Sequence, residues 1–171
     1  DVLVRLHLAE CLRAAQSIPL DVHTVLDFGS GAGFPGIPIQ IARPELRVTL
    51  AESQKKKAAF LREVVRDLRL SGASVHAGRV EEMAASSTFD LVTLRAVDRM
   101  ELAVQAALPR VRAPHDSHRG ACMVLTSLSE VAALTAGVSV EKQDSIAMQW
   151  MPPEEIPGTG QRVILLGWRT R

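Results

Sequence analysis

Apolar and polar residues alternate along this chain in two rhythms, one typical of helices and one typical of strands. Apolar residues that recur every three or four positions predict helices at residues 3–15, 35–42, 56–70, 100–112 and 128–137. Short apolar or alternating runs predict strands at residues 24–28, 47–52, 74–79, 89–96, 121–127, 138–150 and 161–169.

Strands and helices alternate through most of the chain, and this order is typical of an α/β fold. We expect a Rossmann-like, mostly parallel sheet of seven strands with helices on both faces. The last two strand segments, 138–150 and 161–169, follow each other without a predicted helix. They therefore predict a C-terminal antiparallel hairpin added to the parallel sheet.

Composition narrows the class of protein. The chain has 171 residues, 47% of them hydrophobic and 23% charged, which fits one globular domain with a core of its own. Only 4% are aromatic and none is Tyr, which argues against a base-stacking platform for single strands. The net charge of +1 means that any nucleic acid would be bound by a local basic patch. Cys11 and Cys122 lie far apart in apolar settings, and we expect buried, reduced thiols.

The segment "VLDFGSGAGFPGIPIQIARP", residues 25–44, places three glycines directly after a predicted strand. Gly29, Gly31 and Gly33 allow unusual backbone angles and let a ligand approach the main chain. Residues 31–36 fit the pattern G-x-G-x-x-G, but a tight turn without a ligand explains a bare match equally well. Glu52 ends the next strand, where an acid can bind both ribose hydroxyls of an adenosine-type cofactor; a helix cap or a solvated charge is the alternative. Together these features favour a nucleoside-binding site.

The charge of Asp27, near the start of the glycine loop, favours one nucleoside cofactor over another. Asp27 would repel the two phosphates of a dinucleotide, but it suits the amino group of a methionyl moiety. S-adenosylmethionine is therefore preferred over NAD. The chain also has no evident catalytic Tyr-Lys or His pair for a nicotinamide oxidoreductase, which is the competing enzyme class. A cofactor-binding or RNA-binding module without activity is a third interpretation.

The chain resembles one known family, the small-subunit ribosomal RNA methyltransferase G family, also called glucose-inhibited division protein B. The resemblance rests on "DFGSGAGFPGIPIQIARP", "LAESQKKKAAFLREV", "GRVEE", "FDLVTLRAV" and "PGTGQRVILL", which follow in the family's order and spacing. It implies a class I methyltransferase that uses S-adenosylmethionine to methylate N7 of a guanosine in the decoding-region loop of 16S rRNA. We expect residues 25–171 to form this domain and residues 1–24 to form an N-terminal helical segment, with chain removed upstream of Asp1. A methyltransferase for another acceptor, or a relative that has lost activity, is the alternative.

The resemblance assigns cofactor-binding roles in the order of the chain. Gly29 and Phe34 would line the methionine and ribose side. The glycine loop itself adds Asp27, Gly31 and Gly33 as cofactor-binding candidates. Glu52 matches the ribose-binding acid of the family.

The pair that follows the third strand matches the family's adenine site. Val80 and Glu81 would hold the base, although Val80 could instead be a core residue and Glu81 an acid favoured in a first helical turn.

Arg95 matches an arginine beside cofactor and acceptor, unless it pairs with Asp90 or Asp98. Guanine N7 carries a lone pair and no proton, so we expect no general base. Arg95 would bind guanine O6 or a flanking phosphate, and is the one residue to which we assign a catalytic role.

The RNA side is marked by basic residues. Lys55 and Lys56, with Lys57, stand at a helix start where the helix dipole disfavours cations. They either form a solvated face or contact phosphate, and Arg162 is a further RNA-binding candidate. Where the family carries Lys-Gly after the fifth strand, this chain has Thr126 and Ser127.

A second basic cluster surrounds the polar loop "APHDSHRG": Arg110, Arg112, His115, His118 and Arg119. These histidines have no acid or Cys at metal-ligand spacing, so we expect no metal site. The expected partner is 16S rRNA or the 30S subunit. We expect a monomer in the cytoplasm that has no contact with a membrane.

Overall fold

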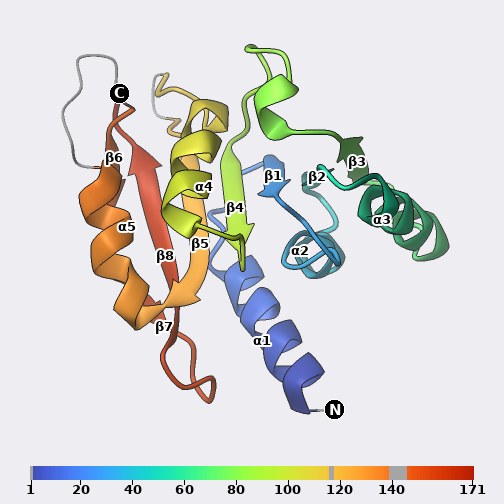
Figure 1. Ribbon diagram of the computed structural model, residues 1–171, viewed down its shortest axis with the longest axis horizontal. Coiled ribbons are helices and arrows are strands. Elements are labelled where there is room, and N and C mark those ends of the chain that lie inside the picture. Colours follow the sequence, from blue (N-terminus) through green and yellow to red (C-terminus); the bar gives the residue numbers. More distant parts are fainter. Residues whose placement is uncertain (1, 116–117, 139–145) are drawn as a thin grey trace.

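The computed structural model describes residues 2–115, 118–138 and 146–171, and its centre is one mixed sheet (Figure 1). The strands are ordered β3-β2-β1-β4-β5-β8-β6, and β7 pairs with β8 outside this path. Their bounds are β1 Thr24–Phe28, β2 Arg47–Glu52, β3 Ala73–Ala77, β4 Leu91–Arg95, β5 Ala121–Ser127, β6 Met148–Trp150, β7 Glu154–Glu155 and β8 Arg162–Arg169. The first five strands pair in parallel, whereas β8 runs antiparallel between β5 and β6. The expected α/β sheet with its antiparallel C-terminal addition is confirmed.

Helices cover both faces of this sheet, because successive residues of each strand point to opposite sides. The α-helices are α1 Val2–Gln16, α2 Gly36–Ala42, α3 Lys55–Asp67, α4 Met100–Ala107 and α5 Val131–Val138. Three short 3₁₀ helices are η1 Val80–Glu82, η2 Leu108–Arg110 and η3 Leu128–Glu130. Residues of α1, α2 and α3 pack in one hydrophobic cluster with the sheet, and residues of α4 and α5 pack in the other. In the described part of the chain, no helix is long and apolar enough to cross a membrane.

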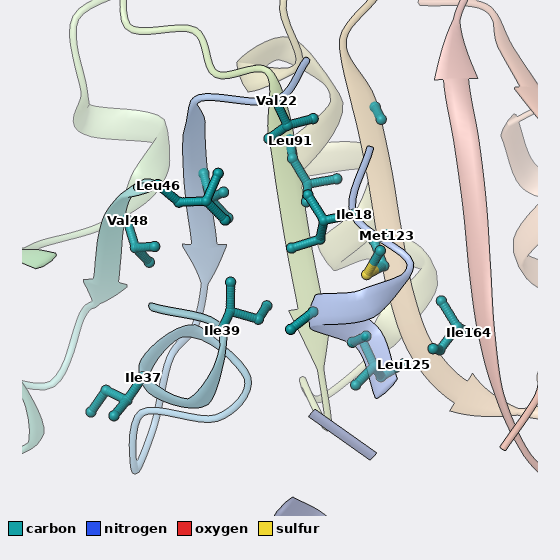
Figure 2. Packing of buried hydrophobic residues seen from close by; sticks show 14 of the residues in the cluster. Ile18, Val22, Ile37, Ile39, Leu46, Val48, Leu91, Met123, Leu125 and Ile164 are labelled. Carbon is teal, nitrogen blue, oxygen red and sulfur yellow. The ribbon is translucent and has the colours of Figure 1, made fainter. Parts of the chain in front are cut away.

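Strand β1 shows how the two cores are divided. Val25 belongs to the cluster under α1, α2 and α3, whereas its neighbour Leu26 belongs to the cluster under α4 and α5. Figure 2 shows the first cluster, in which Ile18, just after α1, lies near Met123 of β5, and Ile39 of α2 belongs to the same cluster. Burying one such side chain contributes about 1.5–3 kcal/mol. The N-terminal helix is therefore part of the same packed unit as the sheet.

Several elements differ from the sequence expectations. The expected helix 100–112 ends as α-helix at Ala107 and continues as η2, because Pro109 has no N–H to continue the helical ladder. The expected strand 138–150 is a strand only at Met148–Trp150, and residues 139–145 lie outside the described residues. The short strand β7 and the turn η1 were not predicted, because two or three residues are too few to show a period.

The order of the strands fixes where a ligand can bind. From β1 the chain continues outward through β2 and β3, then returns to the other side of β1 to form β4 and β5. The loops after β1 and β4 therefore lead to helices on opposite faces of the sheet, α2 and α4. In open α/β sheets, the crevice at such a switch point beyond the carboxyl ends of the strands is the usual ligand site.

Candidate functional site

The glycine loop after β1 adopts backbone angles that other residues rarely take. Gly29, Gly31 and Gly33 have φ angles of +69°, +58° and +95°. A Cβ added at Gly33 would lie 2.3 Å from Ile37 Cδ1, so a side chain there would have to displace Ile37. The loop is closed by a 2.7 Å hydrogen bond from Gly33 N–H to the Ser30 carbonyl. The glycines thus serve a tight turn as well as any ligand above it.

Asp27 lies underneath this loop. Its side chain is fully buried, with Oδ2 accepting from the Gly36 N–H at 3.2 Å and Oδ1 accepting from the Thr93 hydroxyl at 3.0 Å. Burial raises the pKa of Asp27 to about 6, although the hydrogen bonds from Thr93 and Gly36 lower it. In this position the carboxylate braces the start of α2. Direct contact between Asp27 and a methionyl group stays a prediction that this burial does not favour.

Glu52 ties the glycine loop to the start of α3. Its Oε2 accepts from the Gly31 N–H at 3.0 Å, and its Oε1 accepts from the Gln54 N–H at 2.8 Å. Both oxygens are thus engaged with backbone, yet each retains a further lone pair. Ribose binding by Glu52 remains a prediction.

A cavity of about 470 Å³ opens at the switch point. Its walls come from the ends of β1 and β2, the turns after β3 and β4, and one side of α4. The lining residues are Phe28, Gly29, Ala51, Ser53, Gly78, Arg79, Val80, Glu81, Val97, Asp98, Arg99, Leu102, Ala103 and Ala106. The cavity combines an apolar wall with carboxylates and guanidinium groups at its edges, which suits a nucleoside that carries charge.

The cavity brings together only some of the residues that the sequence singled out. Gly29, Val80 and Glu81 line it, although they lie up to 52 positions apart in the chain. Gly31, Gly33, Phe34, Asp27, Glu52 and Arg95 are not among the lining residues. Val80 is also buried in the cluster under α4 and α5, so its core role and its place in the cavity wall coexist.

Sequence reasoning missed the residues after β4. Val97, Asp98 and Arg99 line the cavity, and Val97 is the side chain that a Cβ at Gly29 would meet at 3.4 Å. Val97 ends the quoted segment "FDLVTLRAV" and Asp98 was considered only as a partner of Arg95, so neither pointed to the cavity. The general rule that ligands bind beyond the carboxyl ends of the strands was the one signal that could have found them.

Arg110 corrects an expectation about the second basic cluster. Its side chain is buried, and it donates to the carbonyls of Ala84 at 2.6 Å, Met83 at 3.0 Å and Glu81 at 3.4 Å. Arg110 therefore fixes the segment that presents Val80 and Glu81 to the cavity, instead of extending into solvent. Its neighbour Arg112 pairs with Asp90 at 2.5 Å.

Arg95 lies on the α1 side of the sheet, where it takes part in an ion network. Its Nε donates to Glu10 Oε2 at 2.8 Å, and its guanidinium also hydrogen bonds to His7 Nδ1. The other oxygen of Glu10 accepts from Arg162 Nε at 2.6 Å. Burial alone would raise the pKa of Glu10, but the hydrogen bonds from Arg162 and Arg95 hold it below its ordinary value of 4.5.

From the sequence, Asp90 or Asp98 was the possible partner of Arg95. The structure shows Glu10 as its partner instead. Neither sequence separation nor helix periodicity connects Glu10 with Arg95, so the pair could not have been predicted. The acceptor role of Arg95 remains a prediction, and the network shows how the guanidinium is held.

The residues expected on the RNA side stand at two separate places. Lys55, Lys56 and Lys57 are exposed at the start of α3, and none forms an ion pair with the residues that the structure describes. Arg162 is instead engaged with Glu10 on the α1 side. The described residues contain no group of three or more His, Cys, Asp or Glu side chains placed to hold a metal ion.

The chain is similar in sequence to one family of known proteins. A family model described as rRNA small subunit methyltransferase G matches residues 1–147. A curated protein of that name from Nitrosomonas europaea is 52% identical over 77 residues, which cover 45% of this chain and 36% of the relative. Its counterpart from Chloroflexus aggregans is 40% identical over 116 residues, which cover 66% of this chain and 49% of the relative. The chain thus spans less than half the length of these curated relatives.

Solved structures support the fold. The mitomycin 7-O-methyltransferase MmcR superposes with a TM-score of 0.72 at 20% identity, over 96% of this chain and 54% of that one. M. jannaschii TYW2 in complex with AdoMet superposes with a TM-score of 0.70 at 12% identity, over 96% of this chain and 75% of that one. At such identities the likeness shows a shared fold.

Proposed function

The chain belongs to the rRNA small subunit methyltransferase G family, and on that premise we propose that it transfers a methyl group from S-adenosylmethionine to N7 of a guanosine in 16S rRNA. The observation that carries the proposal is the cavity at the switch point. It is walled by Gly29 of the glycine loop and by the Val80–Glu81 pair, the positions that the family resemblance assigns to the cofactor.

The lining residues fit S-adenosylmethionine. A volume of about 470 Å³ lies within the range typical of small-molecule sites. Val80 and Ala103 offer an apolar surface for a flat base, and Glu81 offers a carboxylate near its edge. Gly29 leaves the main chain bare where a ligand would approach, and Asp98 would offer a second carboxylate to a cationic group in the cavity. TYW2, which shares this fold, was solved with AdoMet.

The remaining loop residues act from beneath the cavity. Asp27 and Glu52 each bind a backbone N–H of the glycine segment, at Gly36 and Gly31, and so hold the loop in shape. Phe34, Gly31 and Gly33 belong to the same turn. We propose that they set the position of Gly29 more than they touch the cofactor.

The chemistry requires little from the protein beyond placement. When bound, S-adenosylmethionine supplies an electrophilic methyl group on a sulfonium. Guanine N7 carries a lone pair in the ring plane and no proton, so the chain needs no general base. Its residues must hold the base in line with the methyl group, about 3 Å away, and exclude water. Glu52 and Arg110, which fix two walls of the cavity, contribute to this placement.

On the acceptor side we propose Arg95 as a contact for a phosphate that flanks the methylated guanosine, with Lys55, Lys56 and Arg162 as further contacts for the RNA backbone. Three exposed lysines beside Ser53, which lines the cavity, support a phosphate contact there. We place the reaction on the 30S subunit or its rRNA, in the cytoplasm and by a monomer.

Two measurements test this function. Calorimetry with S-adenosylmethionine, and with NADH as the comparison ligand, should show binding of the first alone. Labelled methyl groups should then pass to 30S subunits that lack their N7-guanine mark, and far less to subunits that already carry it. Binding without transfer to either would leave a cofactor-binding module and contradict the proposed reaction.

A further inference from the structure

A second hollow lies beside the cofactor cavity, between the first turns of α4 and α5. This α4–α5 groove has a volume of about 350 Å³. Its lining residues are Arg99, Met100, Glu101, Leu102, Glu130, Ala133 and Leu134. Arg99 and Leu102 line the cavity as well, so the two hollows adjoin. In the chain, α4 follows β4, and α5 follows β5 through η3 (Figure 1), so the segments that line the groove come after the carboxyl ends of these two strands.

The groove has apolar walls and one carboxylate that is fixed in place. Met100, Leu102 and Leu134 offer apolar surface, and the Leu102 side chain is exposed. Glu130 lies on the α5 side, away from the cavity. Its Oε2 accepts from the N–H of Ser127 at 3.1 Å, from the hydroxyl of Ser127 at 2.9 Å, and from the hydroxyl of Thr126. Its Oε1 has no hydrogen bond to any residue that the structure describes.

These hydrogen bonds also keep the side chain charged. The hydroxyl of Thr126 and the N–H and hydroxyl of Ser127 hold the pKa of Glu130 below its ordinary value of 4.5. At neutral pH the groove therefore presents a carboxylate with an acceptor oxygen turned away from its own helix cap. Thr126 and Ser127 stand where the family carries Lys-Gly, so this chain uses that position to orient an acid.

We propose that the α4–α5 groove receives the guanine base of the acceptor RNA, and that Glu130 is the residue that selects guanine by accepting hydrogen bonds from its N1–H and N2–H. This inference rests on the proposed function and names the site of its acceptor. Guanine presents two adjacent donors on this edge, and Glu130 Oε1, which accepts from no described residue, has two lone pairs to receive them. Adenine presents an acceptor at N1, which the carboxylate would repel. Enzymes that modify a base read its Watson–Crick edge in this way, and pack its faces between apolar side chains.

The shape of guanine links this contact to the reaction. N7 lies on the opposite side of the purine from N1 and N2. A base held at Glu130 by that edge therefore turns N7 back toward Arg99 and Leu102, where groove and cavity adjoin.

The charge that develops during transfer strengthens the same contact. The lone pair of N7 forms the new bond to carbon, the electron pair of the broken sulfur–carbon bond stays on sulfur, and no proton moves. Positive charge passes from the sulfonium to the purine, which makes N1–H and N2–H better donors. The hydrogen bonds to Glu130 are thus stronger in the transition state than in the ground state, as catalysis requires.

The test compares guanosine with inosine at the methylated position of a reconstituted subunit. Inosine lacks the N2 amino group and keeps N7. The wild-type chain should methylate inosine with a kcat/KM about 10-fold lower than guanosine, because inosine loses one of the two hydrogen bonds to Glu130; a 10-fold change corresponds to about 1.4 kcal/mol, close to the value of one hydrogen bond to a charged group. Glu130→Gln should methylate guanosine about 10- to 100-fold more slowly and should lose most of the preference over inosine. Glutamine is accepted in a capping box, so the start of α5 should persist.

A control variant and a binding assay separate the role of Glu130 from the methyltransferase activity itself. Glu155→Gln changes an exposed acid on β7 and should keep both the rate and the preference. Fluorescence anisotropy with labelled RNA should show the same guanosine preference in binding, and its loss in Glu130→Gln. Equal rates on guanosine and inosine in the wild type, or loss of the preference in Glu101→Gln instead, would overturn the assignment while leaving the methyltransferase intact. No transfer to guanosine by a folded wild-type chain would overturn the proposed function itself.

Discussion

Replacing Glu10 should destabilise this protein more than replacing any surface acid. Glu10 is 3% exposed, and its two oxygens lie 2.8 Å from Arg95 Nε and 2.6 Å from Arg162 Nε. Glu10→Gln removes the charge that both guanidinium groups share. The Arg95 side chain is 10% exposed, so it would remain as a buried cation without its carboxylate.

The magnitude follows from how much of each partner is buried. Breaking a buried ion pair by removing one member costs about 3–5 kcal/mol. Arg162 is 32% exposed and keeps a 3.3 Å hydrogen bond to the Leu125 carbonyl, so water and that bond offset part of its loss. We therefore expect about 3 kcal/mol for Glu10→Gln, and about 1 kcal/mol for Arg162→Gln.

Urea unfolding followed by circular dichroism measures both values, with Glu155→Gln as the control that should stay within about 0.5 kcal/mol of the wild type. The pH dependence gives a second check. Because the pKa of Glu10 is lower in the folded chain, its contribution is present above 4.5 and is lost as pH falls through the folded value. A Glu10→Gln loss below about 0.5 kcal/mol at pH 7 would refute the reasoning, since the network would then contribute nothing to the fold.

Three further predictions concern the cofactor loop and the cavity. Gly33→Ala should lower the free energy of unfolding by about 1–3 kcal/mol, because φ is +95° and the new Cβ would meet Ile37; a loss within error would contradict the close packing. The folded chain binds the Asp27 proton more tightly than the unfolded chain does. Its stability should therefore gain from that group as pH falls from about 6 toward 3.8, and Asp27→Asn should remove this gain in urea unfolding; matching pH profiles would argue against it. Glu81→Gln should weaken S-adenosylmethionine binding about 10-fold by calorimetry with an unchanged Tm, because Glu81 is exposed at the cavity, and unchanged affinity would remove it from the site.

The elements that could be predicted are those with a clear period or a strong local signal. The strands at 24–28, 47–52 and 121–127 match the structure residue for residue, because each is an apolar or alternating run with turn residues at its ends. The glycine loop was found from its φ requirements, which the three positive angles confirm. Family resemblance then selected Val80 and Glu81, which no period or spacing distinguishes.

Contacts between distant segments could not be predicted. Glu10 and Arg162 are 152 positions apart, and only the finished sheet brings α1 to the start of β8. Arg110 looked like one of several loop cations until the fold buried it against the carbonyls of η1 and the residues after it. Asp27 lies next to the glycine loop, as the sequence indicates. The sequence does not show that its carboxylate turns under the loop and is buried there, away from a ligand above.

The most direct test of the account maps the product of the reaction. Subunits without their N7-guanine mark would be incubated with labelled S-adenosylmethionine and the wild-type chain, and the rRNA would then be cleaved at N7-methylated guanosines by mild reduction and aniline. The account predicts one labelled guanosine in the decoding-region loop and strand scission at that position. Label on another atom or in another loop, with the chain folded and bound to its cofactor, would contradict it.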